Sequence, residues 1–250
     1  MFMKILAVKL YEGGYMTEDF ALGGEGTDGL DEKKLYPSSL QNYVIDTGSE
    51  VILVDTGIPK EYPESEPAPG QKIYQGKRIK DYVSALAAIG YEPKDVSKIL
   101  LTHKHPDHSG ELRSFPDSKI YMSQAEAEAL KLKGANVEAV QFEDGPYHNF
   151  EKSKKIAEGI YFLPAPGHTL GNSIVVVEAE GLYYMIHGDI TYTDEALYKN
   201  RLSLVFEDKK AARESLEKVR GFIKKNPTVY VSTHTPQGIE NLENNKITVL

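Results

Sequence analysis

The 250-residue sequence contains no cysteine. Disulfide bonds, thiolate metal ligands and a cysteine nucleophile are therefore excluded. Any metal site in this chain has to use histidine, aspartate or glutamate side chains. Because a cysteine-free chain fits a reducing compartment, we expect a cytoplasmic protein.

Long apolar runs are also missing, and no stretch approaches the roughly 20 residues that cross a bilayer. The segment from Met1 to Leu10 holds an apolar run that Lys9 interrupts, and no small-residue cleavage site follows it. The segment predicts a first β-strand rather than a signal peptide. We expect no insertion into a membrane.

Basic residues do not predominate, since 29 Lys and Arg stand against 37 Asp and Glu and give a net charge of −8. This acidic balance argues against a nucleic-acid groove. Hydrophobic residues make up 40% of the chain and charged residues 26%, which is an ordinary globular composition. Length and composition together predict one large domain over residues 1–250.

Short apolar runs between turn residues predict β-strands. The expected strands are 43–46, 51–54, 99–101, 120–122, 160–163, 173–177, 182–186 and 229–231. The first two flank residues 47–50, which have the composition of a hairpin turn. Helical periodicity predicts helices over 79–90, over 127–133 after a possible capping box of Ser123 and Glu126, and over about 209–224. This mixture of elements indicates α/β layers.

Two longer segments are expected to be loops. Residues 11–42 are rich in glycine, and residues 58–78 are rich in proline. Loops of this length in a compact domain are often lids or binding loops. A plain surface connection or an oligomer contact is an equally good interpretation.

The two halves of the chain repeat one pattern of strand, Asp, helix, strand and Thr-His. The first half contains Asp55 and then His103, and the second half contains Asp189 and then His234 at a similar separation. Each of these side chains comes just after a predicted strand. We therefore expect two related β/α halves that face each other, with a site at their shared edge.

Three of the seven histidines fall within the segment His103-Lys-His105-Pro106-Asp107-His108. In an extended chain His103 and His105 point to the same side, because side chains alternate with period two. Pro106 forces a turn that redirects Asp107 and His108 to a second position. One short segment is therefore able to serve two metal ions about 3.5–4 Å apart.

Three further metal-competent residues follow other predicted strands. They are His168 after 160–163, Asp189 after 182–186 and His234 after 229–231. Imidazole and carboxylate ligands without thiolate suit zinc, iron, manganese or cobalt. The pattern predicts a metal centre built from seven side chains.

These motifs resemble the metallo-β-lactamase superfamily, and the resemblance extends from Asp55-Thr56-Gly57 to His234. It implies an α/β fold, a four-layer αβ/βα sandwich. It also implies two Zn²⁺ ions per chain, with other divalent metals as alternatives. The implied ligands are His103, His105 and His168 for one ion, Asp107, His108 and His234 for the other, and Asp189 as a bridge. Asp55 would orient a ligand from behind, although a plain turn residue before Gly57 is an equally good interpretation.

Within the superfamily the sequence is similar to the quorum-quenching N-acyl-homoserine lactonases, in which a tyrosine three residues after the bridging aspartate touches the substrate carbonyl. Tyr192 stands at that position. The resemblance implies a zinc hydrolase that opens the ester ring of acyl-homoserine lactones through a metal-bridging hydroxide. Asp107, as proton shuttle, and Tyr192, as oxyanion donor, are the expected catalytic residues. The partner would be a small-molecule substrate, an acyl-homoserine lactone or a related ester.

The sequence departs from those lactonases at two places. Pro106 replaces a bulky aromatic residue, and the segment 58–78 is richer in proline and charge. Acyl-chain preference is therefore left open. A thioester hydrolase similar to glyoxalase II, a mononuclear-iron persulfide dioxygenase and a non-enzymatic metal-binding role are alternatives. A monomer and a homodimer are both compatible with the sequence.

Two histidines lie outside the expected ligand set. Alternation places His187 on the same face as Asp189, where it is either a residue behind the ligands or a core residue, and the core is preferred. His148 is expected on a surface loop.

Overall fold

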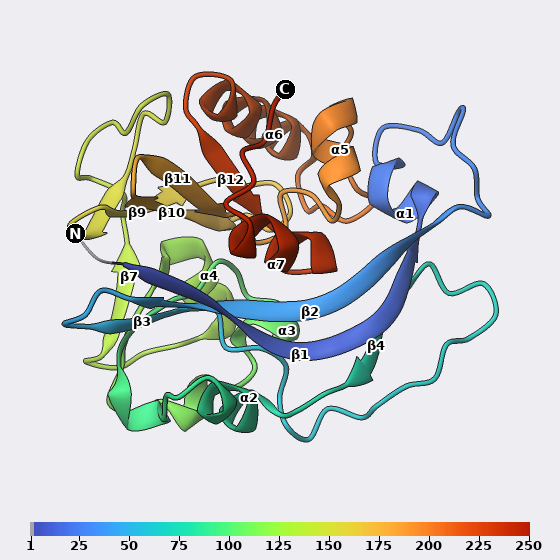
Figure 1. Cartoon of the computed structure of the whole chain (residues 1–250). Coiled ribbons are helices and arrows are strands. Elements are labelled where there is room, and N and C mark those ends of the chain that lie inside the picture. Colours follow the sequence, from blue (N-terminus) through green and yellow to red (C-terminus); the bar gives the residue numbers. More distant parts are fainter. Residues whose placement is uncertain (1–2) are drawn as a thin grey trace.

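The computed structural model describes residues 3–250, so that Met1 and Phe2 of the expected first strand lie outside the described residues. Two β-sheets stack face to face, and helices cover their outer faces (Figure 1). This four-layer αβ/βα sandwich confirms the predicted fold class. Among the described residues, no helix is long and apolar enough to cross a membrane.

The strands are β1 Lys4–Thr17, β2 Leu35–Asp46, β3 Val51–Val54, β4 Ile73–Arg78, β5 Val96–Leu100, β6 Lys119–Ser123, β7 Val137–Val140, β8 Lys154–Ala157, β9 Ile160–Pro164, β10 Ser173–Ala179, β11 Leu182–Ile186 and β12 Thr228–Val231. The helices are α1 Glu18–Leu22, α2 Tyr82–Ala88, α3 Pro106–Ser109, α4 Gln124–Leu130, α5 Asp194–Lys199, α6 Lys209–Ile223 and α7 Pro236–Glu243. Short 3-10 turns lie at Pro93–Asp95 and Leu112–Ser114.

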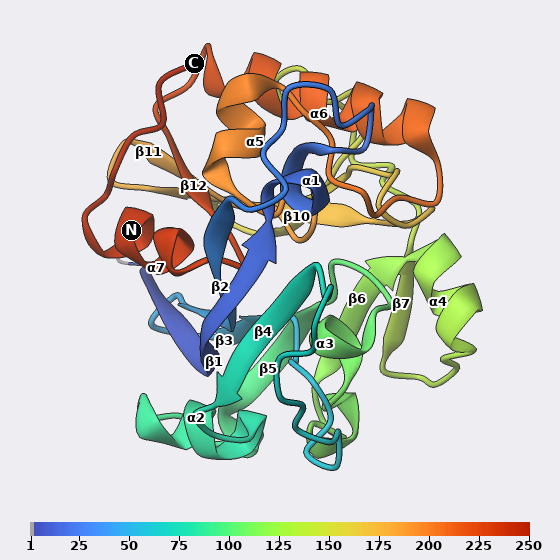
Figure 2. The ribbon, with the colours of Figure 1, turned by 90° about the vertical axis from the view of Figure 1, so that its right-hand side faces the viewer.

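The larger sheet has the order β4-β1-β2-β3-β5-β6-β7 (Figure 2), and the smaller has the order β12-β11-β10-β9-β8. Most neighbouring strands in the first half of the larger sheet and in the smaller sheet are antiparallel. Two parallel pairs matter for the site: β3 pairs with β5, and β11 pairs with β12. In each pair, the carboxyl ends of both strands reach the same edge of the sheet.

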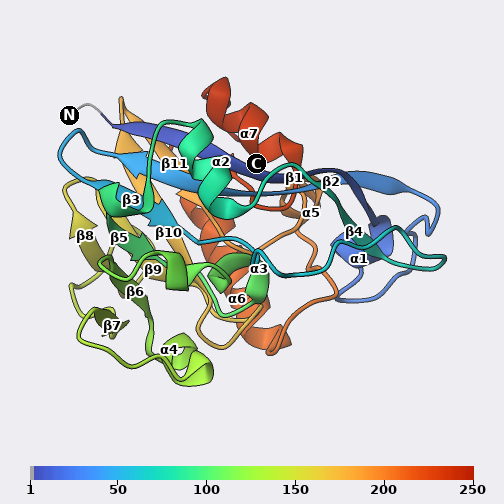
Figure 3. The same cartoon turned by 90° about the horizontal axis from the view of Figure 1, so that it is seen from below.

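Three apolar layers separate the four layers of secondary structure. Side chains from the facing surfaces of both sheets, such as Ile45 and Val175, fill the middle layer. Leu86 of α2 and Ala127 of α4 belong to the layer on the outer face of the larger sheet (Figure 3). Leu216, on the apolar face of α6, belongs to the layer outside the smaller sheet. Burial of these faces is the main favourable contribution to folding.

The structure contains the predicted first strand, the eight further predicted strands and the three predicted helices, and most of them differ from the prediction at their ends. The hairpin of β2 and β3 turns at residues 47–50, as expected. The predicted helix 79–90 begins only at Tyr82, because the Asp81 side chain accepts from Ser84 N and caps the helix there. The helix predicted at 127–133 is α4, which begins directly after its N-cap Ser123 and ends at Leu130.

The prediction that residues 11–42 form a loop was wrong for most of the segment. β1 continues through the glycines to Thr17, α1 follows, and β2 begins at Leu35. The glycines mark an irregular, tightly packed strand, since β1 changes register between Tyr11 and Gly14. A Cβ atom at Gly14 would collide with the β4 backbone. The segment 58–78 is also not entirely a loop, because residues 73–78 form β4, which pairs with β1 and extends with it toward α1 (Figure 3).

Candidate metal centre

The predicted ligands come from the ends of strands in both sheets. His103 follows β5, His168 follows β9, Asp189 follows β11 and His234 follows β12. The parallel pairs β3–β5 and β11–β12 bring the Asp and the Thr-His of each half together, as the internal repeat predicted. The edge shared by the two sheets therefore carries groups from both halves of the chain.

Pro106 determines how one segment contributes to two positions. It is the first residue of the single-turn helix α3, and His105 is the N-cap. Proline at this position fits a helix start, because its missing N–H has no partner there in any case. His103 and His105 stay on one side of the turn, whereas Asp107 and His108 lie within it.

Three histidines form the first group of potential ligands. His105 Nδ1 lies 3.1 Å from His103 Nε2 and 2.9 Å from His168 Nε2. The rings of these residues are nearly perpendicular to one another, with interplanar angles of 85–89°. Three imidazole nitrogens thus converge on one point, which is a geometry able to hold a cation.

Asp107, His108 and His234 form the second group. His108 Nε2 lies 3.3 Å from His234 Nε2, and Asp107 Oδ2 lies 3.6 Å from His234 Nε2. Asp189 stands between the two groups. Its Oδ2 lies 3.2 Å from His234 Nε2 and 3.4 Å from His168 Nε2, and its Oδ1 lies 3.3 Å from His108 Nε2. All seven predicted residues therefore meet at one place.

The donor set fits metal ions. Lone pairs from several imidazoles and carboxylates converge, and within the described chain the buried Asp189 Oδ1 makes no hydrogen bond, although His108 Nε2 lies 3.3 Å from it. Burial opposes protonation of His108, but the nearby carboxylates of Asp189, Asp55 and Asp107 outweigh it and raise the pKa of His108 well above its usual value. The field at this point therefore favours positive charge.

In three of the histidines, the ring nitrogen that faces away from the proposed metal position contacts another group. His108 Nδ1 lies 2.7 Å from Asp55 Oδ2, and His103 Nδ1 lies 3.0 Å from Thr102 Oγ1. His168 Nδ1 lies 3.1 Å from the carbonyl oxygen of Val205. Such contacts set the ring orientation and the tautomer that presents the other nitrogen to a metal.

Asp55 combines both interpretations that the sequence left open. It is a turn residue, with a φ of 66°, and its carboxylate also contacts His108. The Thr102 N–H and hydroxyl donate to the same carboxylate at 2.7 and 2.8 Å. Asp55 thereby connects the potential ligand His108 to Thr102, the residue before His103.

Tyr192 lies against the ligands. Its ring stacks on His234 at 5.0 Å between centroids and meets Phe20 of α1 edge-on at 4.9 Å. Burial and the nearby Asp189 carboxylate raise the pKa of Tyr192 well above its usual value. The phenol is therefore protonated at neutral pH and able to donate a hydrogen bond.

A cavity of about 260 Å³ opens beside Asp107. Its lining includes Tyr11, Tyr62, Tyr74, Gln75, Pro106 and Asp107. Gln75 of β4 donates from Nε2 to Asp107 Oδ2 at 3.0 Å. The segment that was expected to be a loop thus contributes both a wall of the cavity and a contact to a potential ligand.

The two remaining histidines lie where the preferred interpretations placed them. His187 is buried, and its ring stacks on Tyr230 at 3.9 Å with an interplanar angle of 7°. Burial lowers the pKa of His187 to about 3. His148 is exposed in the loop between β7 and β8, with a φ of 51°.

Sequence reasoning missed three residues behind the ligands. Thr102 had a signal, since a Thr-His pair follows the strand in both halves of the internal repeat, at Thr102-His103 and at Thr233-His234. Glu126 had only the signal of a capping box, but its carboxylate accepts from the backbones of Lys104 and Gly171. Gln75 had no sequence signal, because its contact depends on the pairing of β4 with β1.

The fold and this site define a class of protein. The sequence profile of the metallo-beta-lactamase superfamily matches residues 38–234, which include all seven residues of the centre. The chain belongs to this superfamily, and it is a hydrolase of the superfamily that is homologous to N-acyl homoserine lactonases.

Individual relatives agree with that class. An N-acyl homoserine lactonase of Bacillus cereus is 27% identical over 210 residues, which cover 78% of this chain and 83% of the relative. A solved N-acyl homoserine lactone hydrolase, described with the product N-hexanoyl-L-homoserine at its catalytic metal centre, has a TM-score of 0.73 at 20% identity, covering 95% of this chain and 94% of that one. The structure of AidC, described as a dizinc quorum-quenching lactonase, has a TM-score of 0.69 at 16% identity, covering 94% and 88%. These two structures are similar to the chain in fold.

Proposed function

We propose that this protein is a dinuclear zinc hydrolase that opens the ester ring of N-acyl-homoserine lactones. The observation that carries the proposal is the convergence of two three-residue groups on either side of Asp189, with Tyr192 stacked against them. The homology to curated N-acyl homoserine lactonases supports the lactone as substrate.

The proposed ligands of the first ion are His103, His105 and His168, and those of the second are Asp107, His108 and His234. Asp189 would bridge the two, since its carboxylate lies within 3.4 Å of nitrogens from both groups. When bound, two such ions act as Lewis acids and make hydroxide available from water near neutral pH.

The side chains of this chain supply the remaining steps. The Tyr192 hydroxyl would donate to the carbonyl oxygen as negative charge develops on it. The ring C–O bond then breaks, and the alkoxide that leaves takes a proton from Asp107, which received it from the attacking water. Asp107 suits this role because its side chain keeps partial access to solvent, at 19%, whereas the Asp189 side chain is almost fully buried.

The cavity beside Asp107 would hold part of the substrate. Its position next to Asp107 and Pro106 places a bound group within reach of the metal centre. Hydroxyl and amide groups share its wall with the apolar Ile58 and Ile73. The acyl chain would therefore meet both polar and apolar contacts there.

A hydrolysis panel on zinc-loaded protein tests the proposal. It would compare acyl-homoserine lactones, thioesters and phosphodiesters, with metal-stripped protein and the His168→Ala variant as controls. We expect lactone turnover and two zinc ions per chain. Rapid thioester cleavage without lactone turnover would instead identify a thioester hydrolase. One iron per chain together with oxygen consumption would identify a persulfide dioxygenase.

A further inference from the structure

Glu126 of α4 is a buried carboxylate that contacts two ligand-bearing loops at once. It is 1% exposed. Its Oε2 accepts a hydrogen bond from Lys104 N at 2.6 Å, and its Oε1 accepts one from Gly171 N at 2.8 Å. Lys104 stands between His103 and His105, and Gly171 is three residues after His168. One side chain therefore joins the loops that carry the three histidines of the first group.

The packing around Gly171 leaves this contact little freedom. A Cβ atom at Gly171 would collide with Ser123 Oγ and would lie 2.7 Å from Glu126 Cγ. Ser123 is the N-cap of α4, so that the start of this helix lies directly against the loop. The position of Glu126 is thus determined by the helix start on one side and by the loop on the other.

A second carboxylate joins the same loops at the surface. Glu207 Oε1 accepts from Lys104 Nζ at 2.5 Å, and Glu207 Oε2 accepts from Leu170 N at 2.8 Å. The backbone N–H of Glu207 also donates to Gly167 O at 2.8 Å. Glu126 accepts from the backbone of Lys104, and Glu207 accepts from the Lys104 side chain. We call Glu126 and Glu207 the carboxylate clamp.

The second group of ligands is held by different contacts. Thr56 N donates to His108 O at 2.6 Å, and Asp55 contacts the His108 ring. Gly110 N, just after α3, donates to Gly57 O at 2.7 Å. Asp55 also reaches the first group through Thr102, whereas the hydrogen bonds of the Glu126 and Glu207 carboxylates within the described chain go to the loops of the first group.

We propose that the carboxylate clamp positions the three-histidine group, with Glu126 as its principal residue, and so determines the affinity of the first metal ion without determining that of the second. This proposal rests on the proposed metal centre. Hydrogen bonds to a charged carboxylate are stronger than those between neutral groups, and the burial of Glu126 strengthens them further. Loss of such a support behind the ligands typically costs about 10–100-fold in metal affinity.

The variants Glu126→Gln and Glu126→Ala form a graded test. Glutamine keeps one acceptor oxygen but turns an NH₂ group toward the other backbone N–H, whereas alanine removes both acceptors. Glu128→Gln is the matched control, because Glu128 lies on the exposed face of the same helix and its side chain accepts a hydrogen bond from Gln124 Nε2. We expect the affinity of the first ion to fall about 10-fold or more in Glu126→Gln, further in Glu126→Ala, and to stay unchanged in the control.

Stepwise chelator competition would measure the two affinities, and cadmium NMR would assign them. The two ions would give separate resonances, because besides the shared Asp189 the first would have three imidazole ligands and the second would have two imidazoles and the Asp107 carboxylate. Selective weakening of the three-histidine ion supports the proposal. Equal weakening of the binding of both ions, together with lower thermal stability of the metal-free protein, would show that Glu126 has only a structural role. That result would overturn the proposal.

If the Glu126 variants do not fold, Glu207→Gln decides the question, because Glu207 is exposed and its substitution alters no buried side chain. We expect a smaller weakening of the same ion, and unchanged affinities in that variant would overturn the proposal. Metal binding by the wild-type protein distinguishes a failure of the proposed function from a failure of the clamp proposal. If the wild-type protein binds no pair of metal ions, the proposed function fails. If it binds two ions whose affinities do not change in the clamp variants, only this inference is overturned.

Discussion

Asp55 Oδ2 lies 2.7 Å from His108 Nδ1, and both residues are buried. The contact joins the turn after β3 to α3, and it leaves His108 Nε2 facing Asp189 and His234. A carboxylate behind a histidine in this way selects the tautomer with a free Nε2 and makes that nitrogen a better ligand.

The substitution Asp55→Asn should therefore weaken binding of the second metal ion by about 10–100-fold. Asparagine tolerates the positive φ of this position, so the backbone is preserved, but its amide cannot accept from both His108 and Thr102. Metal titration of the purified variant would measure the loss. Asp46→Asn is the control, since Asp46 contacts Tyr91 and Gly48 at the other end of the hairpin. Equal zinc affinity in Asp55→Asn and wild type would contradict this role.

The buried strands were the most predictable part of the fold. β11 has the predicted bounds of residues 182–186, and β12 begins one residue earlier than expected. Continuous apolar runs bounded by turns leave few alternatives for strands that are covered on both faces. The short helix α5 and the edge strand β4 were missed because neither contains enough regularly spaced apolar residues to predict a helix or a strand. In addition, β4 contains Gly76 and Lys77.

The convergence of the seven potential ligands was predictable for a different reason from the contacts behind them. The segment 103–108 carries its chemistry within six consecutive residues, and the internal repeat pointed to Asp189 and His234. The contact of Gln75 with Asp107 and that of Glu126 with Gly171 join residues far apart in sequence, through β4 and α4. No local pattern encodes such contacts, because each depends on how the sheets and helices pack.

Tyr192→Phe should lower kcat by about 100-fold and leave the zinc content unchanged. Phenylalanine keeps the stacking on His234 and the edge contact with Phe20, so that only the hydroxyl donor is lost. Steady-state kinetics with a lactone substrate and metal analysis of the same preparation would test this. Tyr198→Phe, on the partly exposed face of α5, is the matched control. An unchanged kcat in Tyr192→Phe would remove the tyrosine from the reaction.

Gln75→Leu should lower kcat about 10-fold, with a smaller effect on KM. The amide of Gln75 holds Asp107 Oδ2, and leucine of similar size removes that hydrogen bond while preserving the wall of the cavity. Gln71→Leu is a suitable control, because Gln71 also lines the cavity but contacts Ala68 N instead. Kinetic constants for both variants would be compared at equal zinc occupancy. An equal loss in both would show that cavity polarity, rather than the position of Asp107, controls turnover.

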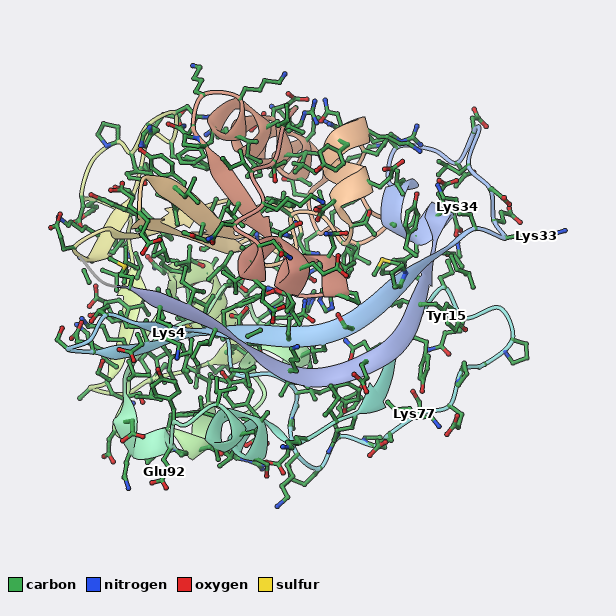
Figure 4. The ribbon with its side chains drawn as sticks, viewed as in Figure 1. Lys4, Tyr15, Lys33, Lys34, Lys77 and Glu92 are labelled. Atoms are coloured by element: carbon green, nitrogen blue, oxygen red, sulfur yellow. The ribbon has the colours of Figure 1, made fainter. Side chains whose placement is uncertain are left out.

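Glu18 should stabilise the protein at neutral pH and lose that effect in acid. Hydrogen bonds from Lys34 Nζ at 2.7 Å and from Asp31 N at 2.8 Å are the main causes that lower the pKa of Glu18 from 4.5 to about 2. Since the folded-state pKa is depressed, the stabilisation is fully present above pH 4.5 and is lost as the pH falls toward 2. Lys34 reaches the carboxylate, whereas its neighbour Lys33 extends away from the molecule (Figure 4).

Glu18→Gln should accordingly reduce the free energy of unfolding by about 2 kcal/mol at pH 7, and by less at pH values near 3. Urea unfolding of the wild type and the variant across this range would give the difference. Glu32→Gln, at an exposed position of the same loop, should cost nothing measurable. A difference that stays constant with pH would show that the ionised form of Glu18 is not the stabilising one.

Pro106→Phe should change which acyl chains the enzyme accepts. Pro106 lines the cavity beside Asp107 and is also the first residue of α3, where a phenylalanine is tolerated because this position needs no special φ. The larger ring would occupy part of the cavity of about 260 Å³ and add an aromatic surface next to the metal centre.

We expect the KM for long-chain lactones to change at least about 3-fold relative to that for short-chain lactones. The kcat for short chains should stay within about 2-fold, because the potential ligands do not move. Kinetics across a series of chain lengths would measure this, with Pro116→Phe as the exposed control. The same shift for every chain length would mean that the acyl group binds elsewhere and that Pro106 acts only through the position of α3.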